Sequence, residues 1–240
     1  MAPEHTRRPL IVVAAEVEAE AIAARFGVSL DRLVPWEVCR LGSGSGSPDL
    51  LLTGLGEANA AGATVRAFDP DQHQVLVSAG IAGALPGPPE AGGIPIGSAV
   101  VASYSRPDVG VSTPDGFLDA WEIGFPLGDF SSQGLPASGD WLERARRSAD
   151  TSGTVLTVSM CSGTDALASE RAQRTGAIAE AMEGAAVGLV AHRLGAAFLE
   201  LRVISNTTGD RDKQHWEIAR ALENLGVFCA AVLGPGREGR

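Results

Sequence analysis

Residues 10–27 read LIVVAAEVEAEAIAARFG. The first five residues, LIVVA, form a continuous apolar run, which is typical of a strand buried on both faces of a sheet. Residues 18–26 then have the composition of a helix, and Gly27 follows them, a residue that often ends helices. A buried strand that leads into a helix predicts a domain in which strands and helices alternate.

The same alternation continues along the chain. We expect further strands at residues 49–54, 74–80, 98–103, 153–158 and 197–205. We expect further helices near residues 59–68, 140–149, 183–194 and 213–233. This order predicts a single-domain α/β fold, a three-layer sandwich whose central, mostly parallel mixed sheet is flanked by helices.

The limits of that domain follow from composition. Residues 9–233 make up the predicted domain, and residues 1–8 and 234–240 are expected to be tails. No linker long enough to divide the chain lies between the tails. Residues 104–138 have weak periodicity and many Pro, Gly and Asp residues, so we expect long loops that line a site.

The charge of the chain restricts its partners. The formal net charge of the 240 residues is −10, and 45% of the residues are hydrophobic. An acidic surface repels phosphate backbones and anionic lipids, so nucleic acid and membranes are poor partners. A small, mostly uncharged substrate is compatible with this charge.

Cysteine and histidine are sparse. Three cysteines stand far apart, and with only four histidines no zinc pattern can be built. This usage suits a reducing cytoplasm. Acidic residues from Glu16 onward interrupt the first apolar run, which excludes a signal peptide, and no window approaches the roughly 20 apolar residues of a membrane helix. We expect a cytoplasmic protein without a metal or other cofactor.

A dinucleotide-binding loop is the first alternative to weigh. The segment TGLGEAN, residues 53–59, follows a predicted strand and opens a predicted helix. Asn59 stands where the third glycine of that fingerprint belongs, and Gln74 stands where an acidic residue is expected. Gly54 and Gly56 therefore fit a tight strand-to-helix turn better than a nicotinamide cofactor site.

Four segments rich in small or polar residues carry a family resemblance. They are AAEVEAE (14–20), SAGIAGAL (78–85), EAMEGAAVG (180–188) and RVISNTTGD (202–210). In this order and spacing they resemble the nucleosidase branch of the nucleoside phosphorylase/hydrolase superfamily over nearly the whole chain. The resemblance implies an enzyme that breaks the N-glycosidic bond of a purine nucleoside.

Three details are similar to the futalosine hydrolases of the alternative menaquinone pathway. Residues 205–206 are Ser-Asn, where methylthioadenosine nucleosidases have Ser-Asp. The chain continues as GDRDKQHW (209–216), and the middle loop contains STPDGFLD (112–119). The resemblance implies hydrolysis of futalosine to hypoxanthine and dehypoxanthinyl futalosine.

Carboxylates suit this chemistry because an oxocarbenium-like sugar forms when the bond breaks. Glu183 resembles the family glutamate that grips the ribose hydroxyls and faces the developing positive charge, and Met182 would pack on the sugar face. Glu18 matches the glutamate that orients and deprotonates water, by its position after the strand, although Glu16 and Glu20 lie close by. Arg202 matches an arginine near the water.

The base and sugar contacts follow from the other motifs. The backbone of Ile81, Ala82 and Gly83 has little side-chain bulk around it and allows close approach to the sugar or the nucleophile. Ser205 precedes Asn206, which is expected to face the base. An asparagine cannot act as a general acid, but its amide can donate two hydrogen bonds, to N7 and to a 6-oxo group.

The same resemblance indicates whether water or phosphate is the nucleophile. Phosphorylases of the superfamily have an arginine at the position of Ser78 and a serine at that of Ile81. A glutamate at position 18 would repel phosphate, so we expect hydrolysis.

The far end of futalosine carries a benzoate-like carboxylate. Arg211 or Arg106 are the candidates to bind it, and Phe117 and Trp121 are candidate aryl contacts or else core residues. Asp165 is a further polar contact or a helix cap.

Two alternatives stay open. One is a methylthioadenosine/S-adenosylhomocysteine or aminofutalosine nucleosidase, against which Asn206 argues. The other is a non-catalytic nucleoside-binding protein, against which the presence of both Glu18 and Glu183 argues. The resemblance also implies a homo-oligomer, a dimer or larger, whose neighbouring subunit contacts the 5′ end of the substrate. The base-stacking residue and the exact nucleoside are left open.

Overall fold

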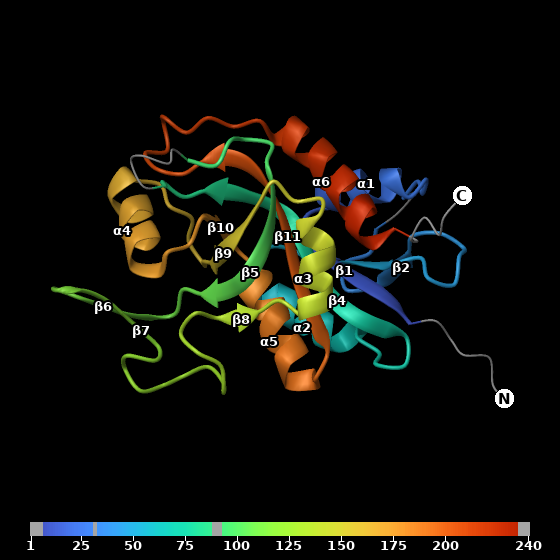
Figure 1. Cartoon of the computed structure of the whole chain (residues 1–240), viewed down its shortest axis with the longest axis horizontal. Coiled ribbons are helices and arrows are strands. Elements are labelled where there is room, and N and C mark those ends of the chain that lie inside the picture. The colour runs from blue at the N-terminus through green and yellow to red at the C-terminus, as the bar shows by residue number, and fades with distance from the viewer. Residues whose placement is uncertain (1–6, 31–32, 88–92, 235–240) are drawn as a thin grey trace.

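The computed structural model describes residues 7–30, 33–87 and 93–234. Its centre is a nine-stranded mixed sheet with the order β10-β9-β5-β11-β4-β1-β3-β2, and β8 pairs with β5 (Figure 1). These strands are β1 (Arg8–Val13), β2 (Val38–Arg40), β3 (Asp49–Leu52), β4 (His73–Ala84), β5 (Ala99–Pro107), β8 (Leu135–Pro136), β9 (Thr151–Thr157), β10 (Ala179–Ala181) and β11 (Ala197–Thr207).

Most neighbouring strands of the sheet are parallel. β4 runs parallel to both β1 and β11, and β1 runs parallel to β3. β5 is antiparallel to β11 and parallel to β9. The sheet also curls, because β10 pairs with β9 on one side and with β4 on the other.

The apolar run of β1 explains how the layers are held together. Leu10 and Val12 point into one hydrophobic cluster, and Ile11 and Val13 point into another on the opposite face. All four side chains are buried. Alternate residues of a strand face opposite sides of its sheet, so a continuous apolar run joins two cores.

Helices cover both faces. The helices are α1 (Glu16–Arg25), α2 (Glu57–Ala67), α3 (Gly139–Arg146), α4 (Asp165–Thr175), α5 (Gly184–Leu194) and α6 (Ile218–Leu233). α1, α3 and α6 pack on one face and α2 and α5 on the other, and Figure 1 shows α1 beside α6. The predicted three-layer α/β architecture is confirmed.

The middle of the chain is more regular than its composition indicates. Within residues 104–138, expected as loops, β5 continues to Pro107, and β6 (Gly110–Thr113) and β7 (Gly116–Asp119) form a hairpin that projects from the body (Figure 1). Even the apolar residues Val111 and Leu118 of this hairpin are exposed, so its strands do not need a regular apolar pattern. A strand that packs on no core carries little of the hydrophobic alternation on which sequence reading depends.

Element ends differ from the prediction at several places. β1 begins at Arg8, whose side chain pairs with Asp49, so this residue lies in the fold rather than in a tail. The last helix begins at Ile218, not near 213. Thr164, not Asp165, caps α4 through its hydroxyl. Of the expected tails, residues 1–6 and 235–240 lie outside the described part of the chain.

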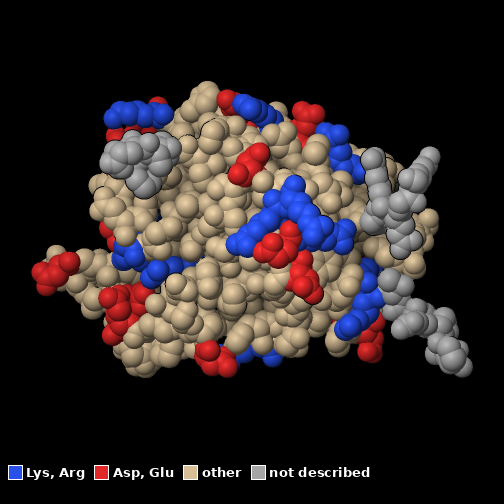
Figure 2. Space-filling model, in the orientation of Figure 1, with Lys and Arg blue, Asp and Glu red and all other residues tan. Residues whose placement is uncertain are grey.

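None of the helices in the described ranges is long and apolar enough to cross a membrane. Figure 2 shows one face of the molecule, on which basic side chains stand beside acidic ones rather than gathering into one continuous patch.

Candidate active site

The predicted site residues meet at the carboxyl ends of three adjacent strands. β1, β4 and β11 are neighbours in the sheet and run in the same direction. Glu18 stands in the first turn of α1, just after β1, and Asn206 lies near the end of β11. Glu183 precedes α5 as its N-cap residue. Ligands of open α/β folds bind at this end of the strands.

Glu18 is buried and tightly held. Its Oε1 accepts a hydrogen bond from the amide of Ile81 at 2.9 Å, and its Oε2 accepts from the amides of Ala14 and Ala15 at 3.2 and 3.1 Å. Burial raises the pKa of Glu18 above its ordinary value, although these backbone donors oppose the shift. Glu16 and Glu20 are exposed, so the structure favours Glu18 among the three.

Gly80 explains how two charged groups approach the chain here. A Cβ at this position would lie 2.5 Å from Nη1 of Arg202 and 2.6 Å from Oε1 of Glu18. Any side chain at position 80 would therefore push the carboxylate or the guanidinium away. A glycine at position 80 is therefore required by the close approach of these two side chains, whereas the sequence analysis expected the segment to approach the sugar or the nucleophile.

Arg202 is buried among carboxylates. Its Nε donates to Glu200 at 2.9 Å, its Nη2 donates to Ser78 at 3.0 Å, and its Nη1 lies 3.7 Å from Oε2 of Glu183. Burial opposes the charge of the guanidinium, yet the carboxylates around it, led by Glu200, raise its pKa. The cluster combines three buried carboxylates, those of Glu18, Glu183 and Glu200, with one guanidinium.

Glu183 is fixed from a second direction. The amide of Gly56 donates to its Oε1 at 3.0 Å, and Gly56 has a φ of +89°. The loop that superficially resembles a dinucleotide fingerprint thus positions a carboxylate. Met182, beside it, is half-buried and packs against the cluster that contains Leu85 and Leu156.

Asn206 occupies an irregularity in β11. The register between β11 and β4 shifts after Ile204, and Asn206 pairs with Gly83 and forms a bridge with Trp216. Its Oδ1 accepts from the Ser205 hydroxyl at 2.8 Å, and its Nδ2 donates to the carbonyl of Thr207 at 2.8 Å. One of the two amide N–H groups is therefore engaged inside the chain, whereas the sequence prediction assigned both to the base.

A pocket of about 420 Å³ opens beside Asn206. Its lining residues come from the ends of β4 and β11, from β10, from the loop before α4 and from the loop before α6. They are Gly83, Cys161, Ser162, Gly163, Glu180, Asn206, Arg211, Gln214 and Trp216. Of the residues predicted from the sequence, the pocket brings together Gly83, Asn206 and Arg211.

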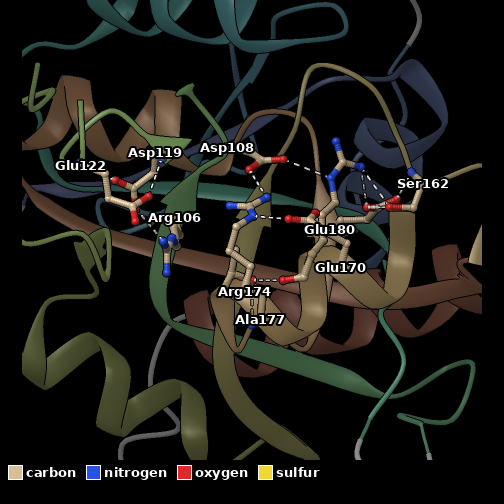
Figure 3. A network of polar contacts seen from close by, with 11 residues as sticks. Arg106, Asp108, Asp119, Glu122, Ser162, Glu170, Arg174, Ala177 and Glu180 are labelled. Atoms are coloured by element: carbon tan, nitrogen blue, oxygen red, sulfur yellow. Dashed lines mark hydrogen bonds and ion pairs between the residues drawn. The ribbon is translucent and has the colours of Figure 1, made fainter. Parts of the chain in front are cut away.

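A buried ionic network supports one wall of this pocket. Glu180 accepts from the amide and the hydroxyl of Ser162, both at 2.6 Å, and pairs with Arg171 at 3.2 Å. Arg171 also donates to Asp108, which in turn pairs with Arg174 (Figure 3). The network fixes the loop that carries Cys161, Ser162 and Gly163.

Three other candidates lie away from the pocket. Arg106 pairs with Asp119 at 3.0 Å, and both side chains are largely buried (Figure 3). The ring of Phe117 lies 4.1 Å from the guanidinium carbon of Arg174. Trp121 packs edge-to-face on Phe130 and donates to its carbonyl. These contacts explain the three side chains as parts of the protein's own packing.

Several site residues escaped the sequence analysis: Gly56 as a positioning donor, Glu200, Arg171, Glu180, Gln214 and Trp216. A charge in an otherwise apolar strand, as in FLELRV (198–203), is a signal for Glu200, since a buried strand tolerates charge only when it is paired. Arg171 and Glu180 carry no such signal, because their partners are distant in sequence.

Residues 10–234 match the family model of the phosphorylase superfamily. The chain belongs to this superfamily, as its motifs predicted. It is 37% identical to a futalosine hydrolase of Streptomyces coelicolor over 234 residues, which cover 90% of this chain and 91% of that protein.

Solved structures share the fold. The 5′-methylthioadenosine/S-adenosylhomocysteine nucleosidase of Neisseria meningitidis aligns with a TM-score of 0.75 at 19% identity, covering 95% of this chain and 98% of that one. The futalosine hydrolase of Helicobacter pylori strain 26695 aligns with a TM-score of 0.73 at 17% identity, covering 94% and 97%.

Proposed function

We propose that this chain hydrolyses the N-glycosidic bond of futalosine and releases hypoxanthine. The observation that carries the proposal is the buried pair Glu18 and Glu183 on either side of Arg202, at the carboxyl ends of β1, β4 and β11. Identity of 37% to a futalosine hydrolase over most of both chains supports this substrate. The reaction would belong to the alternative menaquinone pathway.

Glu18 acts as the general base toward water. An ionised carboxylate has about four acceptor positions, and three backbone amides occupy three of them. Within the residues that the structure describes, no further donor bonds to Glu18, so the remaining position can accept a proton from water. The raised pKa brings the carboxyl group closer to the pH at which a base works efficiently.

Glu183 holds the ribose and faces the charge that develops on it. As the bond breaks, the sugar becomes cationic, and a carboxylate whose position is already fixed stabilises that cation without reorganising. Gly56 and Arg202 fix Glu183 from two sides. Met182 and the backbone of Ile81, Ala82 and Gly83 complete the sugar side of the site.

Water rather than phosphate is the nucleophile. The N–H groups of Arg202 face Glu200, Ser78 and Glu183. With three carboxylates around this guanidinium, the cluster is anionic overall. An anionic cluster repels phosphate, whereas it stabilises the oxocarbenium-like sugar.

We also propose that the chain acts in the cytoplasm as a homo-oligomer. An apolar pocket of about 250 Å³ lies between α2 and α5, with Phe130 and Leu189 in its lining. Leu55 and Phe125, each two residues before a lining residue of this pocket, are 66% and 76% exposed. Exposed apolar groups around a pocket mark protein interfaces. Light scattering on the wild type and on Phe125→Asp tests this: a monomeric wild type contradicts it.

The experiment on function is a phosphate-free incubation with futalosine, aminofutalosine, inosine and methylthioadenosine, followed by chromatography of the free bases. Hypoxanthine from futalosine is the expected result. Adenine from the 6-amino substrates alone would move the chain to the methylthioadenosine or aminofutalosine nucleosidases. If wild-type protein binds these nucleosides but releases no base, it is a nucleoside-binding protein.

A further inference from the structure

The guanidinium of Arg211 lies in the wall of the pocket that Asn206 also lines. The loop that follows β11 places it there, because the amide of Arg211 donates to the carbonyl of Gly163 at 3.0 Å. Its guanidinium lies 4.8 Å from the ring centre of Trp216. The backbone of Gly163 and the ring of Trp216 thus hold the Arg211 guanidinium in the same pocket wall as Asn206, the residue expected to face the purine.

Gln214 orients this cation. Its Oε1 accepts from Nη1 of Arg211 at 2.9 Å and from Nε1 of Trp216 at 3.1 Å. Its Nε2 donates to the carbonyls of Ser162 and Gly209, at 3.0 and 2.9 Å. Within the ranges 7–30, 33–87 and 93–234, no carboxylate lies within 4.0 Å of the Arg211 guanidinium, so its remaining N–H groups are free to meet a ligand.

Asn206 alone offers one hydrogen-bond donor too few for the edge of a 6-oxopurine, and Arg211 can supply the second. The N7 and O6 atoms of a 6-oxopurine are two acceptors on one edge of the base. Asn206 has one N–H left for them, because the other is donated to Thr207. A second donor is needed, and a guanidinium carries five N–H groups in a fixed fork.

We propose that Arg211 donates to O6 of the purine and stabilises the negative charge of the departing base. The inference rests on the proposed function. As the N9–C1′ bond breaks, its electron pair moves onto the purine and spreads to O6. Water forms the new bond to C1′, and Glu18 takes its proton. The base departs from C1′ as an anion, and that proton then reaches it, so that the free product is neutral hypoxanthine.

Asn206 cannot neutralise the negative charge of the departing base, and Arg211 would stabilise that charge. An asparagine cannot protonate the leaving group, so the base must leave as an anion before a proton reaches it. The guanidinium is charged at every working pH and therefore assists as a fixed cation. An amino group at C6 would present N–H toward the same cation, which disfavours adenine.

The test compares Arg211→Met and Arg211→Lys with Lys213→Met. Lys213 is exposed, pairs with Asp210 and does not line the pocket, so it is a matched loss of one positive charge from the same loop. Kinetics are measured on futalosine and on inosine, which lacks the aryl carboxylate. Binding of free hypoxanthine and of adenine is measured by calorimetry.

Arg211→Met is expected to lose about 10²-fold in kcat on both substrates, the range found when one donor to a developing oxyanion is removed. Hypoxanthine binding weakens while adenine binding does not, Arg211→Lys recovers part of the rate, and Lys213→Met stays near wild type. Loss confined to futalosine with unchanged hypoxanthine binding would assign Arg211 to the substrate carboxylate and overturn the inference. A wild type that releases no hypoxanthine refutes the proposed function instead.

Discussion

The amide of Gly56 donates a 3.0 Å hydrogen bond to Oε1 of Glu183, which joins the turn between β3 and α2 to the start of α5. The two residues are far apart in sequence, and each depends on the other's local geometry. Gly56 presents its N–H because its φ is +89°, a conformation that side chains rarely adopt. The carboxylate that we propose to hold the ribose is thus positioned by a turn.

Gly56→Ala is therefore expected to impair activity more than stability. An alanine at φ +89° and ψ 165°, a region that is essentially restricted to glycine, strains the backbone by about 1–3 kcal/mol and displaces the donor from Glu183. We expect kcat/KM to fall about tenfold or more. Gly195→Ala is the control, since Gly195 has a φ of +65° with open space around it. Equal activity losses in both variants, at equal losses in urea stability, would refute the positioning role.

Glu18→Gln should remove the general base while leaving the fold intact. We expect kcat to drop by about 10²–10⁴-fold with little change in substrate affinity. Glu16→Gln and Glu20→Gln, both at exposed positions of the same helix, should retain wild-type rates. Steady-state kinetics and calorimetric binding of substrate to Glu18→Gln provide the measurement. Full activity in Glu18→Gln would remove this residue from the mechanism.

The pH dependence of kcat/KM should report the same carboxyl group. Burial raises the pKa of Glu18 above 4.5, and the base works only when it is ionised. Activity is therefore present above this raised pKa and is lost as the pH falls through it, tenfold per pH unit. Profiles from pH 4 to 8, with circular dichroism to verify folding, check the sign. An acid limb at or below pH 4.5 contradicts it.

Breaking the buried pair Arg171–Glu180 should destabilise the protein. Arg171→Met leaves the Glu180 carboxylate, which is only 3% exposed, without its cation. Loss of one partner of a buried pair costs about 3–5 kcal/mol. The double substitution Arg171→Met/Glu180→Gln should recover much of this loss, because the neutral glutamine keeps an amide oxygen that accepts from Ser162, and Asp108 keeps Arg174 as its partner. Urea unfolding measures both, and a double variant no more stable than Arg171→Met would count against the account.

The parts of the molecule that depend on local patterns could be predicted from the sequence. The apolar run of β1 is visible because both faces of that strand are buried. The sequence analysis predicted Glu18 as a site residue from its distance to the same strand, and Asn206 from the motif that contains it. The network of Asp108, Arg171 and Glu180 could not be predicted, because each member finds its partner only after the chain has folded.

In the loop around Gln214 and Trp216, the sequence predicts a helix that the structure does not have. Its sequence continues the amphipathic pattern of α6, and a helix was expected from about residue 213. In the structure this segment instead turns back, and Trp216 forms a bridge with Asn206. A contact with a functional strand overrides local helical preference here, and such departures are expected at sites.

The curl of the sheet has a consequence for the solution behaviour of the protein. A strand with an unpaired side is a template on which another chain can add, and this is a route to aggregation. At one end of the strand order, β10 has β9 on one side and β4 on the other, so residues 179 and 180 offer no such template. At the opposite end stands β2, which is only three residues long. The curvature that brings Glu180 to the pocket wall therefore also removes the open edge at the β10 end of the sheet.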